Sequence, residues 1–330
     1  MKKVLFIAPA FFGYYNEIKK ELEKQNYEVD FFFDSSNNSN IFKALSRLNK
    51  KNVKILMKKY YNNKVKPIII EKKYDFVFFI YAMSCSFSTE MIKDMRDLQK
   101  EAKFIAYQWD GEKNIMFVKK MHKYFDDIYT FDRIDYLNNN KYKFLPLFYI
   151  DMYKKIGELE NKDFKYDVSY IGTAHPKKLY FINKMAETLK EKFPKQYIFH
   201  YIPSRLKYYY HKLKNKEYRK VKLKDLELKK LPPEKVREIF ANSKCIFDAP
   251  QEGQNGLTIR TIECLGARKK IITANTDIVN YDFYNKKNIY IFKEGNIDFN
   301  DIFFKSEYEE IPKEIYDKYS IKNWVNTMIN

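Results

Sequence analysis

Short apolar segments alternate with amphipathic segments along the first half of the chain. Near-continuous apolar stretches predict buried strands at 4–9, 27–33, 76–81, 104–107 and 127–130. Between them, apolar residues recur with helical spacing, most clearly at 16–25 and 90–99. Because strands and helices alternate, we expect an α/β fold with a doubly wound parallel sheet.

The second half repeats this alternation after a charged break. Residues 154–165 lack apolar periodicity and are predicted to form an interdomain linker. Beyond them, strands are expected at 167–171, 198–201, 245–247, 271–273 and 289–292. A chain of 330 residues exceeds the size that one hydrophobic core usually serves, so two domains are expected.

The predicted organisation has four parts. Residues 1–153 form an N-terminal Rossmann-like domain, the linker 154–165 follows, and residues 166–312 form a C-terminal Rossmann-like domain. In the last segment, 313–330, we expect Tyr319, Trp324 and Met328 to serve as packing anchors.

A polar turn follows the first predicted strand of the second half. It contains Gly172, Thr173, His175 and Lys177, with Pro176 suited to the first position of a helix. Unpaired backbone N–H groups at a helix N-terminus attract anions, and the lysine adds positive charge. The alternative is an ordinary strand-to-helix turn with solvated lysines.

A strand, loop, helix and strand follow one another over 246–275, which is a βαβ unit. In its loop and helix, Gly256 permits close backbone approach and the Thr258 hydroxyl can donate a hydrogen bond. Arg260 can bind phosphate through its planar fork, and Glu263 can accept from a ribose diol. The alternative is a capped surface helix with an Arg–Glu pair at i,i+3, worth a few tenths of a kcal/mol.

Taken together, these residues suggest a family. The sequence resembles the donor half of bacterial GT-B glycosyltransferases over the string Gln254-x-Gly256-Leu257-Thr258-x-Arg260-x-x-Glu263. The closest group occurs in capsule and lipopolysaccharide clusters and is distantly similar to the spore-coat CgeB-like transferases. Further matching pieces lie near Gly172 and over 109–146, so the resemblance covers most of the chain.

The resemblance implies two Rossmann-like domains facing a cleft, with the acceptor on the N-terminal domain and the nucleotide-sugar on the C-terminal one. It also implies a C-terminal helix that crosses back to the N-terminal domain. The donor-binding residues that we expect are Gly172, Thr173, His175, Lys177, Gln254, Gly256, Leu257, Thr258, Arg260 and Glu263. Loss of Arg260 is expected to abolish transfer while leaving the fold intact.

Two signatures of related enzymes are missing. The sequence has no Asp-x-Asp metal motif of the GT-A kind, so we expect no metal and no cofactor besides the donor substrate. The retaining signature, two glutamates separated by seven residues, is not met because Asn255 stands eight positions before Glu263. The stereochemical outcome therefore cannot be carried over.

Candidates for a catalytic base follow the end of a predicted strand in the N-terminal half, beginning with Gln108-Trp109-Asp110. An inverting transfer needs a group that takes the proton of the acceptor hydroxyl, and a carboxylate can do so. Asp110 is the first candidate and Glu112 the second. Asp110 could instead cap the following helix, and Trp109 could either stack on a sugar or pack at an interface.

The net charge of +19 indicates a polyanionic partner. Much of the excess lies in the tyrosine-rich segment 205–230. This segment fits an anionic membrane surface, a nucleic-acid groove or a solvated insertion. The cysteines show no metal or disulfide spacing, and no apolar run approaches the length of a membrane span, which indicates a cytoplasmic protein.

From these observations we expect a metal-independent glycosyltransferase that moves a sugar from a nucleotide-sugar to a lipid-linked polysaccharide or lipopolysaccharide acceptor. It would be cytoplasmic and peripheral on the inner face of the membrane. A nucleotide-sugar epimerase of the same fold and a basic nucleic-acid-binding protein remain alternatives. The second would leave 254–263 unexplained, so no nucleic-acid partner is expected.

Overall fold

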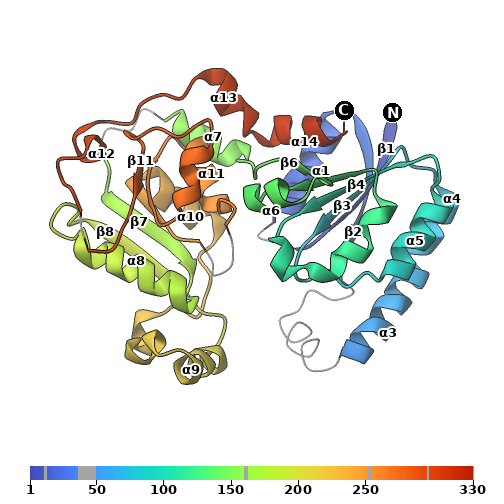
Figure 1. Ribbon diagram of the computed structural model, residues 1–330, viewed down its shortest axis with the longest axis horizontal. Coiled ribbons are helices and arrows are strands. Elements are labelled where there is room, and N and C mark those ends of the chain that lie inside the picture. The colour runs from blue at the N-terminus through green and yellow to red at the C-terminus, as the bar shows by residue number, and fades with distance from the viewer. Residues whose placement is uncertain (11–12, 36–49, 160–162, 251–254, 296, 330) are drawn as a thin grey trace. The chain divides into compact units, whose positions relative to one another are not determined.

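The structure is a computed structural model that describes residues 1–10, 13–35, 50–159, 163–250, 255–295 and 297–329, apart from the side chains at 50–52. It divides into two compact units, one of Met1–Pro146 with Ile321–Asn330 and one of Leu147–Ser320. Each unit contains one parallel sheet with helices on both faces, as Figure 1 shows. The predicted pair of Rossmann-like domains is confirmed.

The first unit is built on a six-stranded sheet in the order β2-β1-β3-β4-β5-β6. Every neighbouring pair of strands is parallel. The strands are β1 (Lys2–Ala8), β2 (Tyr27–Phe33), β3 (Phe76–Tyr81), β4 (Lys103–Gln108), β5 (Asp127–Thr130) and β6 (Tyr142–Phe144). All six residues of β3 are buried, as expected for a central strand covered on both faces.

Alternate side chains of the central strands contact helices on opposite faces. Phe79 packs against Phe87 and the helix that follows it, whereas Phe78 lies 6.0 Å from the ring of Trp324. This two-residue period is what places a helical layer on each side of a strand. Among the described residues of this unit, the α- and π-helices are α1 (Tyr14–Lys24), α3 (Lys50–Tyr60), the π-helix Tyr61–Val65, α4 (Lys66–Glu71), α5 (Thr89–Leu98), α6 (Arg133–Asn138) and α14 (Ile321–Ile329).

Helix α14 returns the end of the chain to the first unit. Its Trp324 is buried between Phe78 and Tyr107, with 4.8 Å between the Trp324 and Tyr107 ring centroids. The Tyr129 hydroxyl donates to the Thr327 carbonyl at 3.0 Å. The predicted crossing of a C-terminal helix onto the N-terminal domain is therefore confirmed for 321–329.

The second unit carries a five-stranded sheet in the order β11-β10-β9-β7-β8. Its strands are β7 (Tyr166–Thr173), β8 (Gln196–Tyr201), β9 (Ser243–Asp248), β10 (Lys270–Thr273) and β11 (Ile289–Ile291). The α-helices among its described residues are α7 (Asp151–Gly157), α8 (Pro176–Thr188), α9 (Arg205–Lys214), α10 (Pro233–Ala241), α11 (Ile259–Gly266), α12 (Ile302–Lys305) and α13 (Lys313–Lys318). Among the helices of the described ranges, none has the length and apolar character needed to cross a bilayer.

Two segments differ from the sequence prediction. The predicted linker begins inside helix α7, which packs on α10 and α11 and buries Tyr153 and Ile156. Two buried apolar residues in a helix of 7 residues are too few to produce a periodic signal. The segment 313–330 also divides: α13 belongs to the second unit, where the Tyr316 hydroxyl donates to the Gly266 carbonyl at 2.7 Å.

Candidate functional site

Three neighbouring strands of the second unit end at one edge of its sheet. β7, β9 and β10 are parallel, so their carboxyl ends lie together, and Thr273 pairs with Asp248 in the register. Helix α8 begins just after β7 and α11 begins after β9. The carboxyl edge of such a sheet is where open α/β folds bind their ligands.

A buried carboxylate connects these elements. Asp248, the last residue of β9, is fully buried and accepts hydrogen bonds from the Thr258 hydroxyl at 2.9 Å and the Thr261 hydroxyl at 3.1 Å. Its other oxygen lies 3.8 Å from the Lys178 ammonium on α8. Burial lowers the pKa of Lys178, and the nearby Asp248 opposes that shift. The strand ends and both helix N-termini are thus held together by one charge network.

Thr258 has the role that its position in the sequence suggests for a helix cap. Its side-chain oxygen accepts from the Thr261 backbone N–H at 3.3 Å, which makes it the N-cap of α11. Gly256 and Leu257 precede it and are buried, and Asn275 holds this loop by donating to the Asn255 carbonyl at 3.0 Å. Gln254 lies outside the described residues.

Arg260 and Glu263 are paired with each other. Their charged atoms are 2.7 Å apart, and their side chains are only 18% and 4% exposed. The guanidinium also stacks on Phe240, with 4.9 Å between the charge and the ring centroid. The Arg–Glu pair at i,i+3, which was the alternative interpretation of the sequence, is therefore present, but as a buried contact and not a surface one.

This pairing changes the expectation for Arg260. Removing the arginine would take away the cation that pairs directly with the buried Glu263 carboxylate, and breaking such a buried pair typically costs about 3–5 kcal/mol of stability. Loss of Arg260 is therefore expected to weaken the fold as well as transfer. A variant at this position cannot serve as a clean test of phosphate binding.

The turn between β7 and α8 presents three of the predicted donor residues. Thr173 and Lys177 are exposed, and His175 is half-buried as the N-cap residue of α8. Pro176 occupies the first helical position, as predicted. The Lys177 side chain belongs to the first turn of the helix, where the positive end of the helix dipole also lies.

Gly172 is required by close packing within its own strand. A Cβ at this position would lie 2.1 Å from the Tyr170 hydroxyl oxygen and 2.5 Å from the ring carbon that bears it. The Tyr170 ring is buried, with 2% of its surface exposed. The glycine thus lets the strand end pass over a tyrosine immediately below the candidate site.

We expect Gly172→Ala to destabilise the second unit by about 1–3 kcal/mol, because the added methyl group overpacks a filled site. The check is a double-mutant cycle with Tyr170→Leu, which removes the atoms that the Cβ would meet. The alanine should cost little in the leucine background, as read from urea unfolding. Strictly additive effects would contradict this packing.

The carboxylates predicted for catalysis lie at the carboxyl edge of the first unit's sheet. Asp110 follows β4, and its side chain accepts from the Met83 backbone N–H at 2.8 Å, so it braces the loop after β3 and does not cap a helix. Burial raises the pKa of Asp110, and the Met83 hydrogen bond only partly opposes the shift. A carboxylate of raised pKa at a strand end is suited to general-base chemistry.

Glu112 has a different environment. It accepts from the Tyr142 hydroxyl at 2.6 Å and lies 2.6 Å from the Lys119 ammonium. Burial opposes its ionisation, but the hydrogen bonds from Lys119 and Tyr142 outweigh burial and lower its pKa. This engaged and readily ionised carboxylate is a weaker candidate for the base.

Sequence reasoning passed over two further groups at these edges. Asp34, directly after β2, is fully buried and accepts from the Ser84 hydroxyl at 2.8 Å. Asp248 stands out in the sequence only as the end of a strand, and its partner Lys178 only as part of a lysine pair. An aspartate directly after a short run of apolar residues, 31–33 or 245–247, is the sequence signal common to both.

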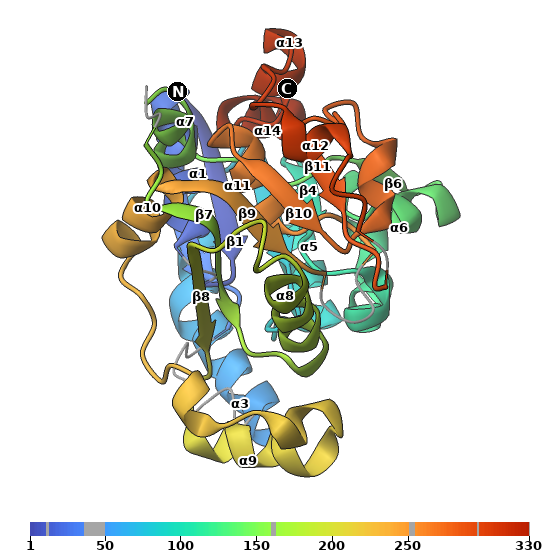
Figure 2. The same ribbon diagram turned by 90° about the vertical axis from the view of Figure 1, so that its left-hand side faces the viewer.

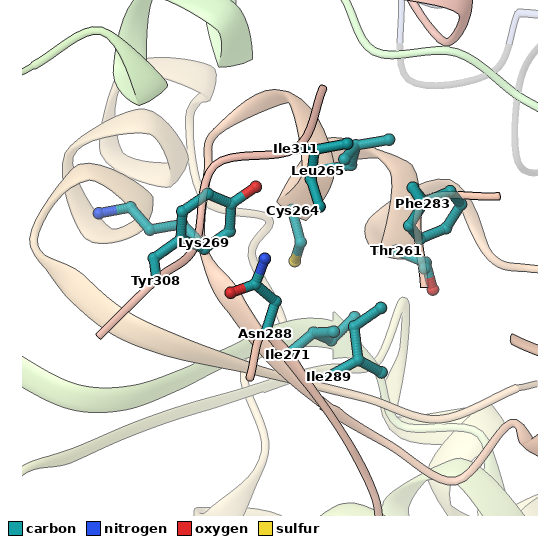
Figure 3. A pocket seen from close by; sticks show the side chains of 10 residues that line it. All are labelled: Thr261, Cys264, Leu265, Lys269, Ile271, Phe283, Asn288, Ile289, Tyr308 and Ile311. Carbon is teal, nitrogen blue, oxygen red and sulfur yellow. The ribbon is translucent and has the colours of Figure 1, made fainter. Parts of the chain in front are cut away.

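Figure 3 shows a separate pocket beside α11, with Cys264, Leu265, Phe283 and Ile289 among the side chains that line it. Its lining is largely apolar, and none of the predicted site residues belongs to it. Lys269 also lines it but donates to the Ala241 carbonyl at 3.0 Å. Asn288, another polar residue of the lining, exchanges hydrogen bonds with the Glu309 backbone, so the pocket is part of the packing around α11.

The chain matches no protein-family model, and no curated protein matches its sequence. Solved structures do match its fold. HepE of Anabaena in complex with UDP and glucose has a TM-score of 0.58 at 11% identity, with 99% of this chain and 98% of HepE covered. An α-glucosyltransferase in complex with UDP and a 13-mer DNA has a TM-score of 0.56 at 12% identity, with 100% and 93% covered.

A third structure, the lipopolysaccharide outer core galactosyltransferase WaaB in its apo form, has a TM-score of 0.50 at 13% identity, with 99% and 95% covered. At such low identity these similarities establish architecture and leave activity open. The two parallel sheets and the matching structures show that this chain has the GT-B fold.

Proposed function

We propose that this protein is a glycosyltransferase that binds a nucleotide-sugar at the carboxyl edge of the second unit's sheet. The observation that carries the proposal is the meeting of the α8 and α11 N-termini at this edge, joined through Lys178 and Asp248. Solved proteins of the same fold hold UDP or UDP-glucose, which supports a nucleotide diphosphate as the ligand class.

In this proposal the donor diphosphate lies over Gly172 and Thr173, with Lys177 offsetting its charge. The N-terminal dipoles of α8 and α11 add to that positive potential. The charge on the leaving group would be stabilised by these groups without a metal ion. Gly256, Leu257 and Thr258 shape the opposite wall of the site through the loop that Asn275 holds.

Arg260 and Glu263 would act from below this surface. Their ion pair leaves the guanidinium close to the end of β7, where it also donates to the Ile171 carbonyl at 3.4 Å. Arg260 therefore contributes positive charge next to the diphosphate, and Glu263 would reach a ribose only if the pair opens. His175 and Gln254 complete the proposed donor contacts.

The proposed acceptor is a lipid-linked precursor of a surface polysaccharide or lipopolysaccharide, bound on the first unit near Asp110. A lipopolysaccharide galactosyltransferase is among the solved proteins with this fold, which supports the acceptor class. Asp110 would remove the proton from the acceptor hydroxyl. Such an acceptor would place the enzyme at the inner face of the membrane.

We expect one nucleotide among UDP, GDP, TDP and CMP to raise the melting temperature of the protein. Saturation at one hundred times the dissociation constant stabilises the folded state by about 2.7 kcal/mol, which corresponds to a shift of several degrees. Lys177→Ala should lower the affinity for that nucleotide by about tenfold, because one charge-assisted hydrogen bond is lost.

The matched control is Lys190→Ala, which removes an exposed lysine just beyond the opposite end of α8. It should bind the nucleotide as the wild type does. No shift with any nucleotide, or equal weakening by both variants, would refute the proposed donor site. Release of an altered nucleotide-sugar without an acceptor would instead identify an epimerase.

A further inference from the structure

An exposed apolar stripe runs along helix α9 in the second unit. Leu206 and Leu213 are 81% and 79% exposed, and Tyr209 and Tyr210 are 56% and 57% exposed. These four positions follow the spacing i, i+3, i+4, i+7, so they share one face of the helix about 100° wide. Single exposed leucines are ordinary, but four large apolar side chains on one face indicate an interaction surface.

Basic residues flank this stripe on both sides. At about 100° per residue, Lys207 and Lys214 lie along one border, and Arg205 and Lys212 lie along the other. The helix contains no acidic residue. A solvated insertion would gain nothing from this arrangement, because its polar side chains would face the water and its leucines would not.

The opposite face of α9 fixes the helix to the second unit. Tyr208 and His211 are buried there, and the Tyr208 hydroxyl donates to the Val221 carbonyl at 2.9 Å. A small hydrophobic cluster encloses this face and consists of Ala174, Leu179, Ile202, Tyr208, Tyr218 and Leu226. The stripe is therefore held outward by packing, and the helix cannot turn it inward without losing this cluster.

The segment that contains α9 leaves the sheet and returns to it at one place. Glu227 pairs with the end of β8: its N–H donates to the His200 carbonyl at 2.7 Å, and its carbonyl accepts from Ile202 at 2.8 Å. α9 thus projects from the carboxyl edge of the sheet, beyond the end of β8, as Figures 1 and 2 show. The candidate donor site lies at the same edge.

From this geometry we propose that α9 is a membrane-docking helix that inserts Leu206, Tyr209, Tyr210 and Leu213 into the headgroup region of an anionic bilayer. Leucines enter the acyl boundary, tyrosines sit at the headgroup level, and flanking lysines contact lipid phosphates. A nucleic acid would use the lysines and the tyrosine rings but would leave both leucines in water, so the lipid surface fits better.

Docking in this manner would place the donor site close to the bilayer. The buried side of α9 touches the turn before α8, where the His175 and His211 rings are 6.3 Å apart. That turn would lie about one helix diameter, roughly 10 Å, above the lipid surface. The inference rests on the proposed function and deepens it, since a lipid-linked acceptor carries its sugar close to the lipid surface. Vesicle binding can nevertheless be measured without catalysis.

The test uses the full chain and sedimentation with two kinds of vesicle, phosphatidylcholine alone and phosphatidylcholine mixed with phosphatidylglycerol. The wild type is expected to bind the anionic vesicles, more weakly at high salt. Leu206→Ser with Leu213→Ser should lower partitioning at least about tenfold, because two leucines no longer enter the apolar boundary. Lys207→Glu with Lys214→Glu should lower it at least as much.

The matched apolar control is Leu159→Ser with Val279→Ser, which removes two exposed apolar side chains elsewhere in the same unit. The charge control is Lys190→Glu with Lys192→Glu, also on exposed positions of that unit. Both controls should partition within twofold of the wild type. Unchanged melting temperatures would show that the α9 variants are folded, as expected for substitutions on an exposed face.

The inference would be overturned if Leu206→Ser with Leu213→Ser partitioned onto vesicles as the wild type does. An equal loss of vesicle binding in the apolar control would also overturn it. Binding of a single-stranded oligonucleotide in place of vesicles, lost only in the charge variant, would identify a nucleic-acid surface and also overturn it. Nucleotide stabilisation without vesicle binding would refute the docking helix alone. Vesicle binding without nucleotide stabilisation would refute the donor proposal alone.

Discussion

Asp110→Asn is expected to lower turnover by about 100- to 10,000-fold, which is the usual contribution of a general base. Nucleotide binding should be unchanged, because the donor is proposed to bind in the other unit. The fold should also be preserved, since the asparagine oxygen can still accept from the Met83 N–H. Initial rates of sugar transfer and a nucleotide thermal shift on the same preparation would measure both effects.

The pH dependence identifies which carboxylate acts. A base must be ionised, so turnover falls as pH drops through its pKa. Burial raises the pKa of Asp110, whereas hydrogen bonds from Lys119 and Tyr142 overcome burial and lower the pKa of Glu112. We therefore expect the turnover of the wild type to fall at acidic pH with a pKa above the ordinary range of aspartate. This fall should be absent in Asp110→Asn. A fall in turnover with a pKa below the ordinary range of glutamate, lost in Glu112→Gln, would instead identify Glu112 as the general base.

Asp248→Ala is expected to lower the free energy of unfolding of the second unit by about 3–5 kcal/mol. The substitution leaves the Lys178 ammonium buried without its carboxylate and deprives two threonine hydroxyls of their acceptor. The double variant with Lys178→Met should recover part of the loss, because it removes the unpaired charge. Urea unfolding followed by far-UV circular dichroism would measure the changes.

Fluorescence provides an internal reference for that experiment. The two tryptophans of the chain, Trp109 and Trp324, both belong to the first unit, so their emission follows the unit that lacks Asp248. The change should therefore be larger by circular dichroism than by fluorescence. Glu187→Ala, an exposed acidic residue of the second unit, should change stability by less than about 0.5 kcal/mol. A loss as large as that of Asp248→Ala would contradict the network.

The sequence predicted the strands because a strand buried on both faces needs an unbroken apolar run, which a half-exposed helix or a loop would interrupt with polar residues. β3 occupies the predicted residues 76–81, and all of them are buried. The predicted linker, 154–165, overlaps the end of helix α7 at 154–157, and the sequence showed no sign of this helix. Contacts fix α7: a Cβ at Gly157 would lie 2.7 Å from the Gly266 carbonyl oxygen, a closeness that no local pattern reveals.

For the candidate site, the sequence alone determined the architecture, the turn before α8 and the string that caps α11. It could not choose between phosphate binding and an internal pair for Arg260, since i,i+3 spacing permits both. Only the tertiary structure buried Glu263 beside it, joined Lys178 to Asp248, and turned Tyr208 inward while leaving Tyr209 and Tyr210 outside. Local spacing defines which faces exist, but the packing of distant segments decides which of them meets water, protein or ligand.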